Sequence, residues 1–410
     1  MNEQSNLVPI LLPGFRSGVG ENLRKINLRK SEKYIGSGDK KLSGGKDGSV
    51  ESLNSESSRL LSLDFFRGMT MFLLIGTLYP TLRDSNVPFL SAIGWQFEHR
   101  YWDALTFYDF IEPFFMFILG VAIPFSIASR QRKGQTSKQI TKHALGRAVI
   151  LFALGILIYW VDAGKTVFRL WNVLTQMSVG YLFAFLLVKR AVKIQILVSL
   201  LLLLCTDLVY RFWPVAGFNQ PFIPDHNFGS WFDLLVMGVL ESDHWVSFNF
   251  IPTTAFIIWG AIAGLILRGE TRYQEKVKIL LLAGGLGIIA GFALEPITPM
   301  IKRIATSSVV LETGGWCFIT LALSYWVIDI KKIKTIPFFF AIVGMNPLFI
   351  YLFTQLGGSS FLQNIASPFG YALFFWANNY LVVLVTELLT WFMLWYICFW
   401  LYKRKIFIKI

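Results

Sequence analysis

The sequence predicts an all-α, polytopic integral membrane protein built as a helical bundle. Its 410 residues are 54% hydrophobic and only 15% charged, whereas a soluble domain carries about 25% charged residues. Apolar runs near the roughly 20 residues that a helix needs to cross a bilayer recur along the chain. Alternating segments of about ten residues, which are typical of outer-membrane barrels, are absent from the sequence.

Ten apolar runs mark the expected helices. They cover residues 60–80, 106–128, 146–162, 170–188, 194–213, 250–267, 279–294, 308–329, 336–356 and 370–402. With the N-terminus placed inside, the inner segments hold 20 Lys and Arg residues and the outer segments hold 7. This excess follows the positive-inside rule. We therefore expect about ten transmembrane helices with a cytoplasmic N-terminus and a cytoplasmic C-terminus, and topology rather than nucleic-acid binding explains the net charge of +13.

Two domains are expected. Residues 1–58 are rich in Ser, Gly, Lys and Asn and cannot bury a core, which predicts a disordered basic cytoplasmic tail. Its lysines can touch anionic lipid head groups, and a solvated tail without function is the simpler alternative. Residues 59–410 form the transmembrane domain. Its longest outer loop, Trp213 to Asn249, is acidic and aromatic and long enough to act as a lid. The last run, Tyr371 to Tyr402, exceeds one bilayer width, so it tilts or begins at the surface near Asn378 and Asn379.

The segment from Phe97 to Ser126, FEHRYWDALTFYDFIEPFFMFILGVAIPFS, concentrates the chemistry. It places His99 just before an apolar run that still contains Asp109 and Glu112. A carboxylate inside such a run costs about 2.5 kcal/mol or more, and an imidazole can take or release a proton near neutral pH. A surface histidine anchored among aromatic residues is the alternative for His99, and pairing with another buried polar group is the alternative for Glu112.

Asp64 and Arg67 lie three residues apart at the start of the first apolar run. They form either a local ion pair at a helix end or, through the guanidinium fork of Arg67, a contact with phosphate oxygens.

These segments resemble the heparan-α-glucosaminide N-acetyltransferase family and its bacterial relatives. The family pattern S-x-D-x-F-R-G, followed by H-x-x-W-x-x-x-T-x-x-D-x-x-x-P-x-F-x-F-x-x-G, is matched at Ser62, Asp64, Phe66, Arg67, Gly68, His99, Trp102, Thr106, Asp109, Pro113, Phe115, Phe117 and Gly120. Residues 296–315 and 344–353 look like later family blocks. The sequence departs from the pattern in two places. Leu78 replaces an asparagine, and RLWNVLTQ at residues 169–176 ends in Thr175 and Gln176 instead of Gln-Arg.

The resemblance implies a membrane-bound acyltransferase. It would move an acetyl or related acyl group from cytoplasmic acetyl-CoA, or another acyl-CoA, to a saccharide amine or hydroxyl of a glycan on the outer side. His99 would be the general base or a transient acyl carrier, with Asp109 orienting it. Asp64 and Arg67 would bind the donor. The expected substrate contacts are Trp102, Thr106, Glu112, Lys302 and Asn346, although Glu112 stands where the family usually has an apolar residue. Lys302 would stabilise an oxyanion or bind an acidic sugar, and a structural role is the alternative for Asn346.

The remaining expectations concern setting and class. The absence of a lumenal domain before the first apolar run favours the cell inner membrane of a bacterium. Acyl-CoA, a sugar acceptor and the lipid bilayer are the expected partners, a homodimer is compatible with the sequence, and nucleic acid is not expected. No metal is expected, since the four histidines have no metal-ligand spacing and the three cysteines lie in apolar runs. The rival class is a non-catalytic, proton-coupled transporter or a lipid-interacting membrane protein, although no internal repeat supports it.

Overall fold

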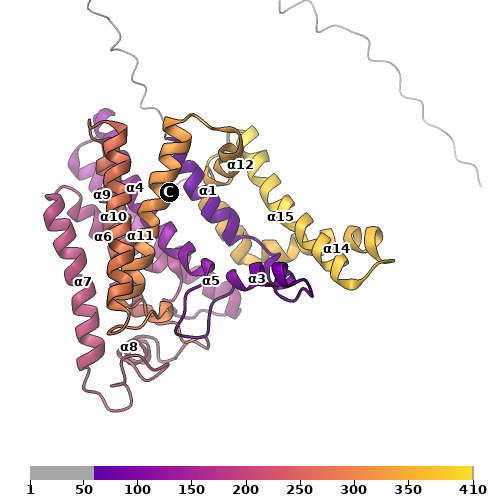
Figure 1. The fold of residues 1–410 in the computed structure, drawn as a ribbon, viewed down its shortest axis with the longest axis horizontal. Coiled ribbons are helices and arrows are strands. Elements are labelled where there is room, and N and C mark those ends of the chain that lie inside the picture. The colour runs from indigo at the N-terminus through magenta and orange to yellow at the C-terminus, as the bar shows by residue number, and fades with distance from the viewer. Residues whose placement is uncertain (1–59, 409–410) are drawn as a thin grey trace, which may run out of the picture. The chain divides into compact units, whose positions relative to one another are not determined.

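The computed structural model describes residues 60–408, and every element in this range is a helix (Figure 1). The tail that the sequence predicts for residues 1–58 lies outside the described range. The elements are α1 (Leu61–Leu74), α2 (Tyr79–Arg83), α3 (Pro88–Gln96), η1 (Phe107–Phe110), α4 (Ile111–Arg132), α5 (Ser137–Ala163), α6 (Val173–Leu187), α7 (Val192–Phe212), α8 (Phe228–Met237), η2 (Ser247–Phe250), α9 (Thr254–Arg268), α10 (Tyr273–Leu294), η3 (Lys302–Ile304), α11 (Ser307–Ser324), η4 (Tyr325–Ile330), α12 (Thr335–Gly344), α13 (Pro347–Phe353), η5 (Thr354–Gly358), α14 (Ser359–Phe374) and α15 (Asn379–Lys403).

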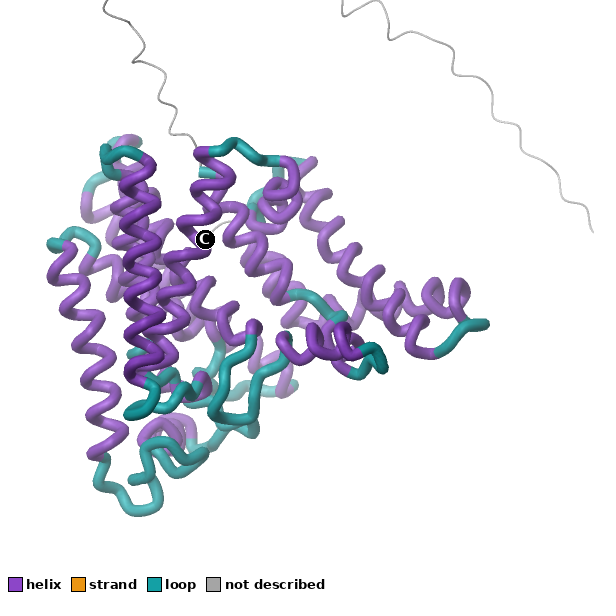
Figure 2. The backbone as a smooth tube through the Cα atoms, viewed as in Figure 1, coloured by secondary structure: helices purple, strands orange, loops and turns teal. Residues whose placement is uncertain are grey.

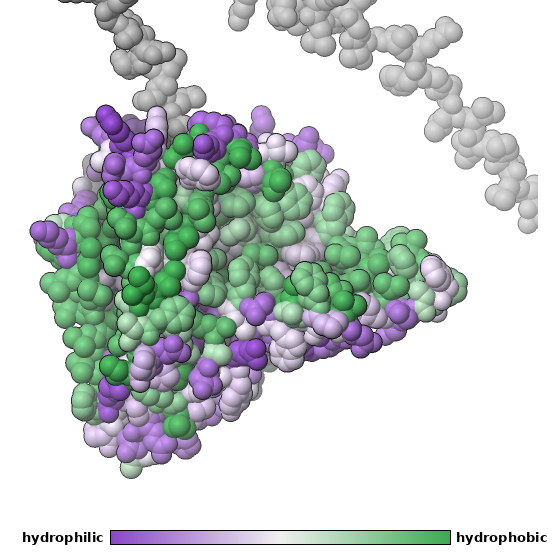
Figure 3. Space-filling view, in the orientation of Figure 1, coloured by the Kyte–Doolittle hydropathy of each residue, from purple (hydrophilic) through white to green (hydrophobic). Residues whose placement is uncertain are grey.

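Seven helices in the described part of the chain are long and apolar enough to cross a membrane. They are Phe107–Arg132, Ser137–Ala163, Val192–Phe212, Ser247–Arg268, Tyr273–Leu294, Ser307–Ile330 and Asn379–Lys403. An eighth is added if Thr335–Gly344 and Pro347–Phe374, which meet at a bend of 63°, form one span. Figure 3 shows hydrophobic residues along the length of these helices and hydrophilic residues at their two ends. The predicted all-α, polytopic membrane bundle is confirmed.

The predicted count of ten is larger than the seven or eight spans that helix length supports. α1 has 14 residues and α6 has 15, fewer than the roughly 20 needed to cross a bilayer. The run expected over 60–80 breaks after α1, which ends at Leu74, and the short helix α2 begins at Tyr79 with Pro80 in its first turn. The run expected over 170–188 starts late because the side chain of Asn172 accepts from the Leu174 N–H and caps α6.

The helix α7 shows how the bundle meets lipid. The exposed side chains on this helix include Leu197, Leu201, Leu204 and Leu208. Its buried side chains include the polar Gln195 and Ser199, and the Ser199 hydroxyl accepts from the indole N–H of Trp259 at 2.8 Å. An apolar outside and a polar inside are the arrangement expected of a helix in a bilayer, where polar groups find partners within the protein.

The helices α4 and α9 cross so closely that only glycine fits at the contact. A Cβ at Gly120 would lie 2.1 Å from the carbonyl oxygen of Ile257, and one at Gly260 would lie 2.0 Å from that of Phe117. Close backbone approach through small residues is a common way to join membrane helices. The crossing buries the middle of α4 and fixes the direction of its first turn, which carries Glu112.

The last apolar run is divided into two helices. α14 ends at Phe374, and α15 begins at Asn379 after Asn378 caps it by accepting from the Leu381 N–H at 2.9 Å. The run is therefore broken at the paired asparagines, and both the tilt and the position of these asparagines at a membrane surface stay predictions.

The longest loops gather at one end of the helices, which we call the loop-rich end (Figure 2). It holds residues 97–106, the segment 213–246 with its helix α8, and residues 295–306. The opposite end, which we call the basic end, holds Arg132, Lys138 and Lys331. The charge asymmetry predicts that the loop-rich end faces outward, and this sidedness stays a prediction.

Candidate active site

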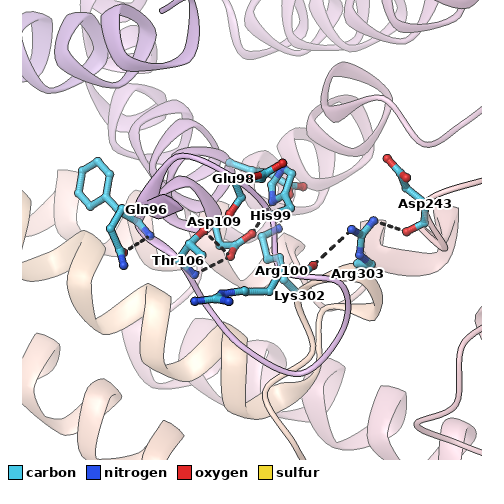
Figure 4. Close-up of polar contacts among 11 residues, drawn as sticks. Gln96, Glu98, His99, Arg100, Thr106, Asp109, Asp243, Lys302 and Arg303 are labelled. Carbon is cyan, nitrogen blue, oxygen red and sulfur yellow. Dashed lines mark hydrogen bonds and ion pairs between the residues drawn. The ribbon is translucent and has the colours of Figure 1, made fainter. Parts of the chain in front are cut away.

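His99 and Asp109 meet at the loop-rich end (Figure 4). Thr106 starts η1, and the side chain of Asp109 returns to the N–H of Thr106 in a capping box. One carboxylate oxygen of Asp109 lies 2.6 Å from Nδ1 of His99, and the other accepts from the Thr106 N–H at 2.8 Å. Asp109 is only 1% exposed. The local turn thus holds a buried carboxylate against the imidazole.

This contact decides which nitrogen of His99 is basic. A carboxylate only accepts hydrogen bonds, so Nδ1 of His99 donates and Nε2 keeps its lone pair. Within residues 60–408, Nε2 has no hydrogen-bond partner, and the His99 side chain is 35% exposed. An imidazole oriented by a carboxylate and open at Nε2 is the arrangement that general bases and nucleophilic histidines need.

Glu112 and Lys302 form an ion pair beside this dyad, although they lie 190 residues apart in sequence. The Lys302 side chain is 5% exposed, and Oε1 of Glu112 is buried without a partner among the described residues. Lys302 also interacts electrostatically with Asp109. Removing two charges from water costs several kcal/mol per ion (about the scale of folding stability itself), so burial of this pair is weak evidence for stability. A role for the pair in the site accounts for it better.

Two residues that the sequence did not single out complete this cluster. The indole of Trp245 lies 5.2 Å from the imidazole of His99 and 5.3 Å from the ammonium of Lys302. Arg303 donates to the carbonyl oxygens of Asp243 and Arg100, and so ties two outer loops together (Figure 4). No local spacing signals either residue, because both act through contacts between distant segments.

The carboxylate of Asp233 on α8 anchors the segment behind Trp245. It is fully buried and accepts from the Trp171 indole N–H at 2.6 Å and from the Ser247 N–H at 3.1 Å. Burial raises the pKa of Asp233 to about 6, even though Ser247 and Trp171 donate to the carboxylate. Trp171 precedes Asn172, so this anchor also joins residues 213–249, the loop predicted to act as a lid and called the lid segment below, to the start of α6.

A second feature is a cavity of about 280 Å³ that reaches toward the basic end. It is enclosed by α1, α4, α5, α6, α13 and the C-terminal segment, and is lined by Arg67, Met71, Phe115, Ile118, Leu119, Ala122, Arg147, Leu151, Val173, Leu174, Met177, Met345, Pro347, Leu348, Tyr351 and Ile408. Its two charged residues are Arg67 and Arg147. Arg67 also pairs with Asp64 at 3.5 Å, so the local ion pair and the cavity-facing position coexist. Arg147 had no assigned role in the sequence beyond its positive charge.

The helix α4 connects the cavity with the dyad. Ala122 and Phe115 line the cavity, and Glu112 follows about one turn beyond Phe115. At 1.5 Å per residue, the ten steps from Ala122 to Glu112 span about 15 Å. At the far wall, the hydroxyl of Tyr351 lies 3.3 Å from the amide nitrogen of Asn172, and Tyr351 interacts electrostatically with Glu112. Along α4, the lining of the cavity therefore stops at Phe115, about one helical turn short of Glu112.

The protein itself uses the polar groups of three predicted substrate contacts. The Trp102 indole N–H donates to the Phe222 carbonyl at 2.7 Å, and the Thr106 hydroxyl lies 2.8 Å from the Glu98 carbonyl. The Asn346 amide donates to the Ile406 carbonyl at 2.9 Å and accepts from the Ile408 N–H at 2.8 Å. The structure therefore makes Thr106 a support of Asp109, ties Trp102 to the loop that contains Phe222, and places Asn346 at the C-terminal segment. As substrate contacts, all three stay predictions.

The two departures from the family pattern are accommodated internally. Leu78 is buried. The Thr175 hydroxyl donates to the Asn172 carbonyl at 2.6 Å, and the side-chain amide oxygen of Gln176 accepts from the Thr253 hydroxyl at 3.4 Å. Among residues 60–408, no group of three or more His, Cys, Asp or Glu side chains is placed to hold a metal ion.

The chain is 28% identical over 141 residues to a human protein, heparan-alpha-glucosaminide N-acetyltransferase, and 28% identical over 108 residues to its mouse counterpart. The chain is similar to heparan-alpha-glucosaminide N-acetyltransferase. The matches cover 33% and 26% of this chain, and only 20% and 15% of the relatives' own lengths. No family model matches the chain. The resemblance carried by the motifs is confirmed as a partial one, and with the apolar helices it supports a multi-pass membrane protein.

Proposed function

We propose that this protein is a transmembrane acyltransferase that uses acetyl-CoA or a related acyl-CoA. The acyl group would pass from the cytoplasmic side to a saccharide amine or hydroxyl at the loop-rich end, in a cell inner membrane. The observation that carries this proposal is the continuity along α4. An arginine-bearing cavity on one side of Glu112 is followed by a histidine with an open nitrogen on the other side.

The cavity suits the donor. Arg67 and Arg147 can meet phosphate oxygens through their guanidinium forks, and the other lining residues are apolar apart from the Tyr351 hydroxyl. A pantetheine arm of about 15–20 Å matches the roughly 15 Å of α4 between Ala122 and Glu112. The thioester would then lie beside Lys302 and within reach of His99, while the nucleotide stays at the basic end.

The dyad suits the transfer. Nε2 of His99 would remove the proton from the acceptor amine or hydroxyl as that group attacks the thioester carbonyl. The Lys302 ammonium would stabilise the oxyanion, the carbon–sulfur bond would break, and the departing thiolate would take up a proton. In the other order, Nε2 itself attacks first and carries the acyl group until the acceptor displaces it. Both orders give the same products and use Asp109 in the same way.

A transporter is the second candidate, and the buried Glu112–Lys302 pair favours it. Ionisable groups within a span often relay protons. A transporter would load and release protons at this pair without transferring an acyl group, and His99 would serve as its outer proton acceptor. The two candidates therefore differ in whether a labelled acyl group reaches an acceptor.

The test is acyl transfer by the purified protein in sealed vesicles. Labelled acetyl-CoA is supplied on one side and glucosamine oligosaccharides on the other, and the acetylated sugar is counted. His99→Ala should lower the rate by at least about 10²-fold, the lower end of general-base assistance, while acyl-CoA binding persists. His226→Ala is the matched control, because the exposed His226 imidazole has one hydrogen bond among residues 60–408, with the Gly217 carbonyl, and none with the dyad.

Three outcomes decide between the candidates. Transfer by His99→Ala within about threefold of the parent would remove the dyad from the mechanism. Proton flux without any acetylated sugar would select the transporter. In a Lys138→Cys variant, an impermeant thiol reagent marks the side of the membrane that the exposed residue 138 faces. Transfer only with acetyl-CoA on that side would support a cytoplasmic donor site, and transfer only with acetyl-CoA on the opposite side would overturn it.

A further inference from the structure

We propose that Trp245 is the positioning residue for His99, an inference that rests on the proposed function. The Trp245 indole meets the imidazole edge to face, with ring centroids 5.2 Å apart and planes at 76°. The Lys302 ammonium and the Arg303 guanidinium lie 5.3 Å and 5.4 Å from the same indole. One side chain thus touches three of the cationic or titratable groups of the site.

Residues 244 to 247, which include Trp245, are each held by a hydrogen bond or ion pair. Each of residues 244 to 247 has its own partner outside the four-residue stretch. The Nδ1 atom of His244 lies 2.8 Å from the Asp225 carboxylate, and the N–H of Trp245 donates to the Glu241 carboxylate at 3.4 Å. The N–H of Val246 donates to the Arg303 carbonyl at 3.4 Å, and the N–H of Ser247 donates to the Asp233 carboxylate at 3.1 Å. So many partners on consecutive residues leave the indole little freedom to move away from His99.

The backbone angles support this. Both His244 and Asp225 have positive φ, at 64° and 60°, a region that non-glycine residues adopt only when their surroundings hold them there. The side-chain contact between these two residues therefore joins two strained points of the lid segment, directly before Trp245. This is the geometry expected of a segment built to present one side chain.

Contacts on the faces of the His99 ring limit how far the ring can rotate. The carboxylate of Asp109 holds only one corner of the imidazole, and a half-exposed ring on one hydrogen bond can swing about it. Tyr108 contacts the ring edge to face at 4.9 Å, and Trp245 is the second aromatic contact. Together they restrict the swing of the ring about its contact with Asp109. The attraction between a cation and an indole face also keeps the Lys302 ammonium beside the imidazole.

The test combines a labelling experiment without turnover and a kinetic experiment. His99 is labelled with diethyl pyrocarbonate and quantified by mass spectrometry in the parent, in Trp245→Leu and in Trp245→Phe. Trp231→Leu is the matched control, since Trp231 packs on Trp213 and Phe228 in the same lid segment and has no ring contact with His99. The kinetic experiment measures kcat and the KM for acyl-CoA for the same four proteins.

Trp245→Leu should label His99 about threefold faster or more, because the indole no longer covers the ring. Its kcat should fall at least about tenfold with an unchanged KM for acyl-CoA, since a misplaced reacting group costs rate rather than donor binding. Trp245→Phe should bring both the labelling rate and kcat most of the way back to the parent values. Trp231→Leu should change neither quantity by more than about twofold.

Two results would overturn the inference. One is labelling and kcat in Trp245→Leu that match the parent, and the other is the same change in Trp231→Leu, which would show a general loss of lid packing. If the parent transfers no acyl group, the proposed function fails by itself. The labelling experiment then still decides whether Trp245 covers and holds His99.

Discussion

Asp109→Asn should change which nitrogen of His99 is protonated. In the parent, one carboxylate oxygen of Asp109 lies 2.6 Å from Nδ1 of His99, and the other accepts from the N–H of Thr106 at 2.8 Å. An asparagine has one acceptor oxygen and one donor nitrogen. The Thr106 N–H can only donate, so the asparagine oxygen must stay with it, and the new NH₂ group then faces His99.

The magnitude follows from that geometry. Facing a donor, Nδ1 of His99 must become an acceptor, and the proton moves to Nε2. The only open nitrogen then lacks a lone pair, and its base function is lost while the fold is preserved. General-base assistance is worth about 10²–10⁴-fold, and a wrong tautomer removes all of it. We therefore expect acyl transfer to fall by about 10³-fold or more, with acyl-CoA binding within about twofold of the parent.

The assay pairs kinetics with nitrogen NMR. Chemical shifts of ¹⁵N-labelled histidine distinguish the two tautomers, and His99 is assigned by its loss in His99→Ala. Asp103→Asn is the control, because Asp103 is an exposed carboxylate in the same loop. A transfer rate for Asp109→Asn within about tenfold of the parent would refute the reasoning. An unchanged tautomer together with a slow reaction would show that Asp109 acts through its charge instead.

Three further predictions test the rest of the site. Lys302→Met should destabilise the protein by about 3–5 kcal/mol in reversible unfolding, because Glu112 is left buried and unpaired. Adding Glu112→Gln should recover most of that stability, and a double variant no more stable than Lys302→Met would contradict the prediction. Arg67→Ala and Arg147→Ala should each weaken acyl-CoA binding about tenfold or more in equilibrium titration, and lysine should restore only part; unchanged affinity would remove that arginine from the donor site. Burial raises the pKa of Asp233 from its ordinary value of 3.8 to about 6, so the folded state holds this proton more tightly than the unfolded state does. The parent should therefore lose up to about 3 kcal/mol of stability relative to Asp233→Asn as pH rises from 4 to 6, and a pH-independent difference would contradict this.

Local pattern was enough for the parts of the site that lie close together in sequence. His99, Thr106 and Asp109 are separated by at most ten residues, and the structure joins all three through one short turn. Composition likewise predicted the helical membrane bundle, because the length and polarity of an apolar run follow from bilayer thickness.

Contacts between distant segments could not be predicted in this way. Glu112 and Lys302 were each recognised as unusual, yet nothing in the spacing of one sequence says that residues 190 apart will pair. Trp245 is one of 14 tryptophans, and only the fold shows which of them touches His99. Arg147 looked like one more basic residue at an inner segment, because its cavity is built from five separate helices.

The position where the family pattern has a second arginine bears on how the donor is held. Here Gln176 occupies it, and its side chain is turned toward Thr253 and the Trp171 carbonyl rather than into the cavity. A neutral amide cannot neutralise a phosphate, so any cationic contribution from this position is lost. The cavity contains two arginines, Arg67 and Arg147, on different helices. Donor affinity should therefore depend on these two together, and Gln176→Arg should strengthen acyl-CoA binding only if the new guanidinium can leave Thr253 and turn into the cavity.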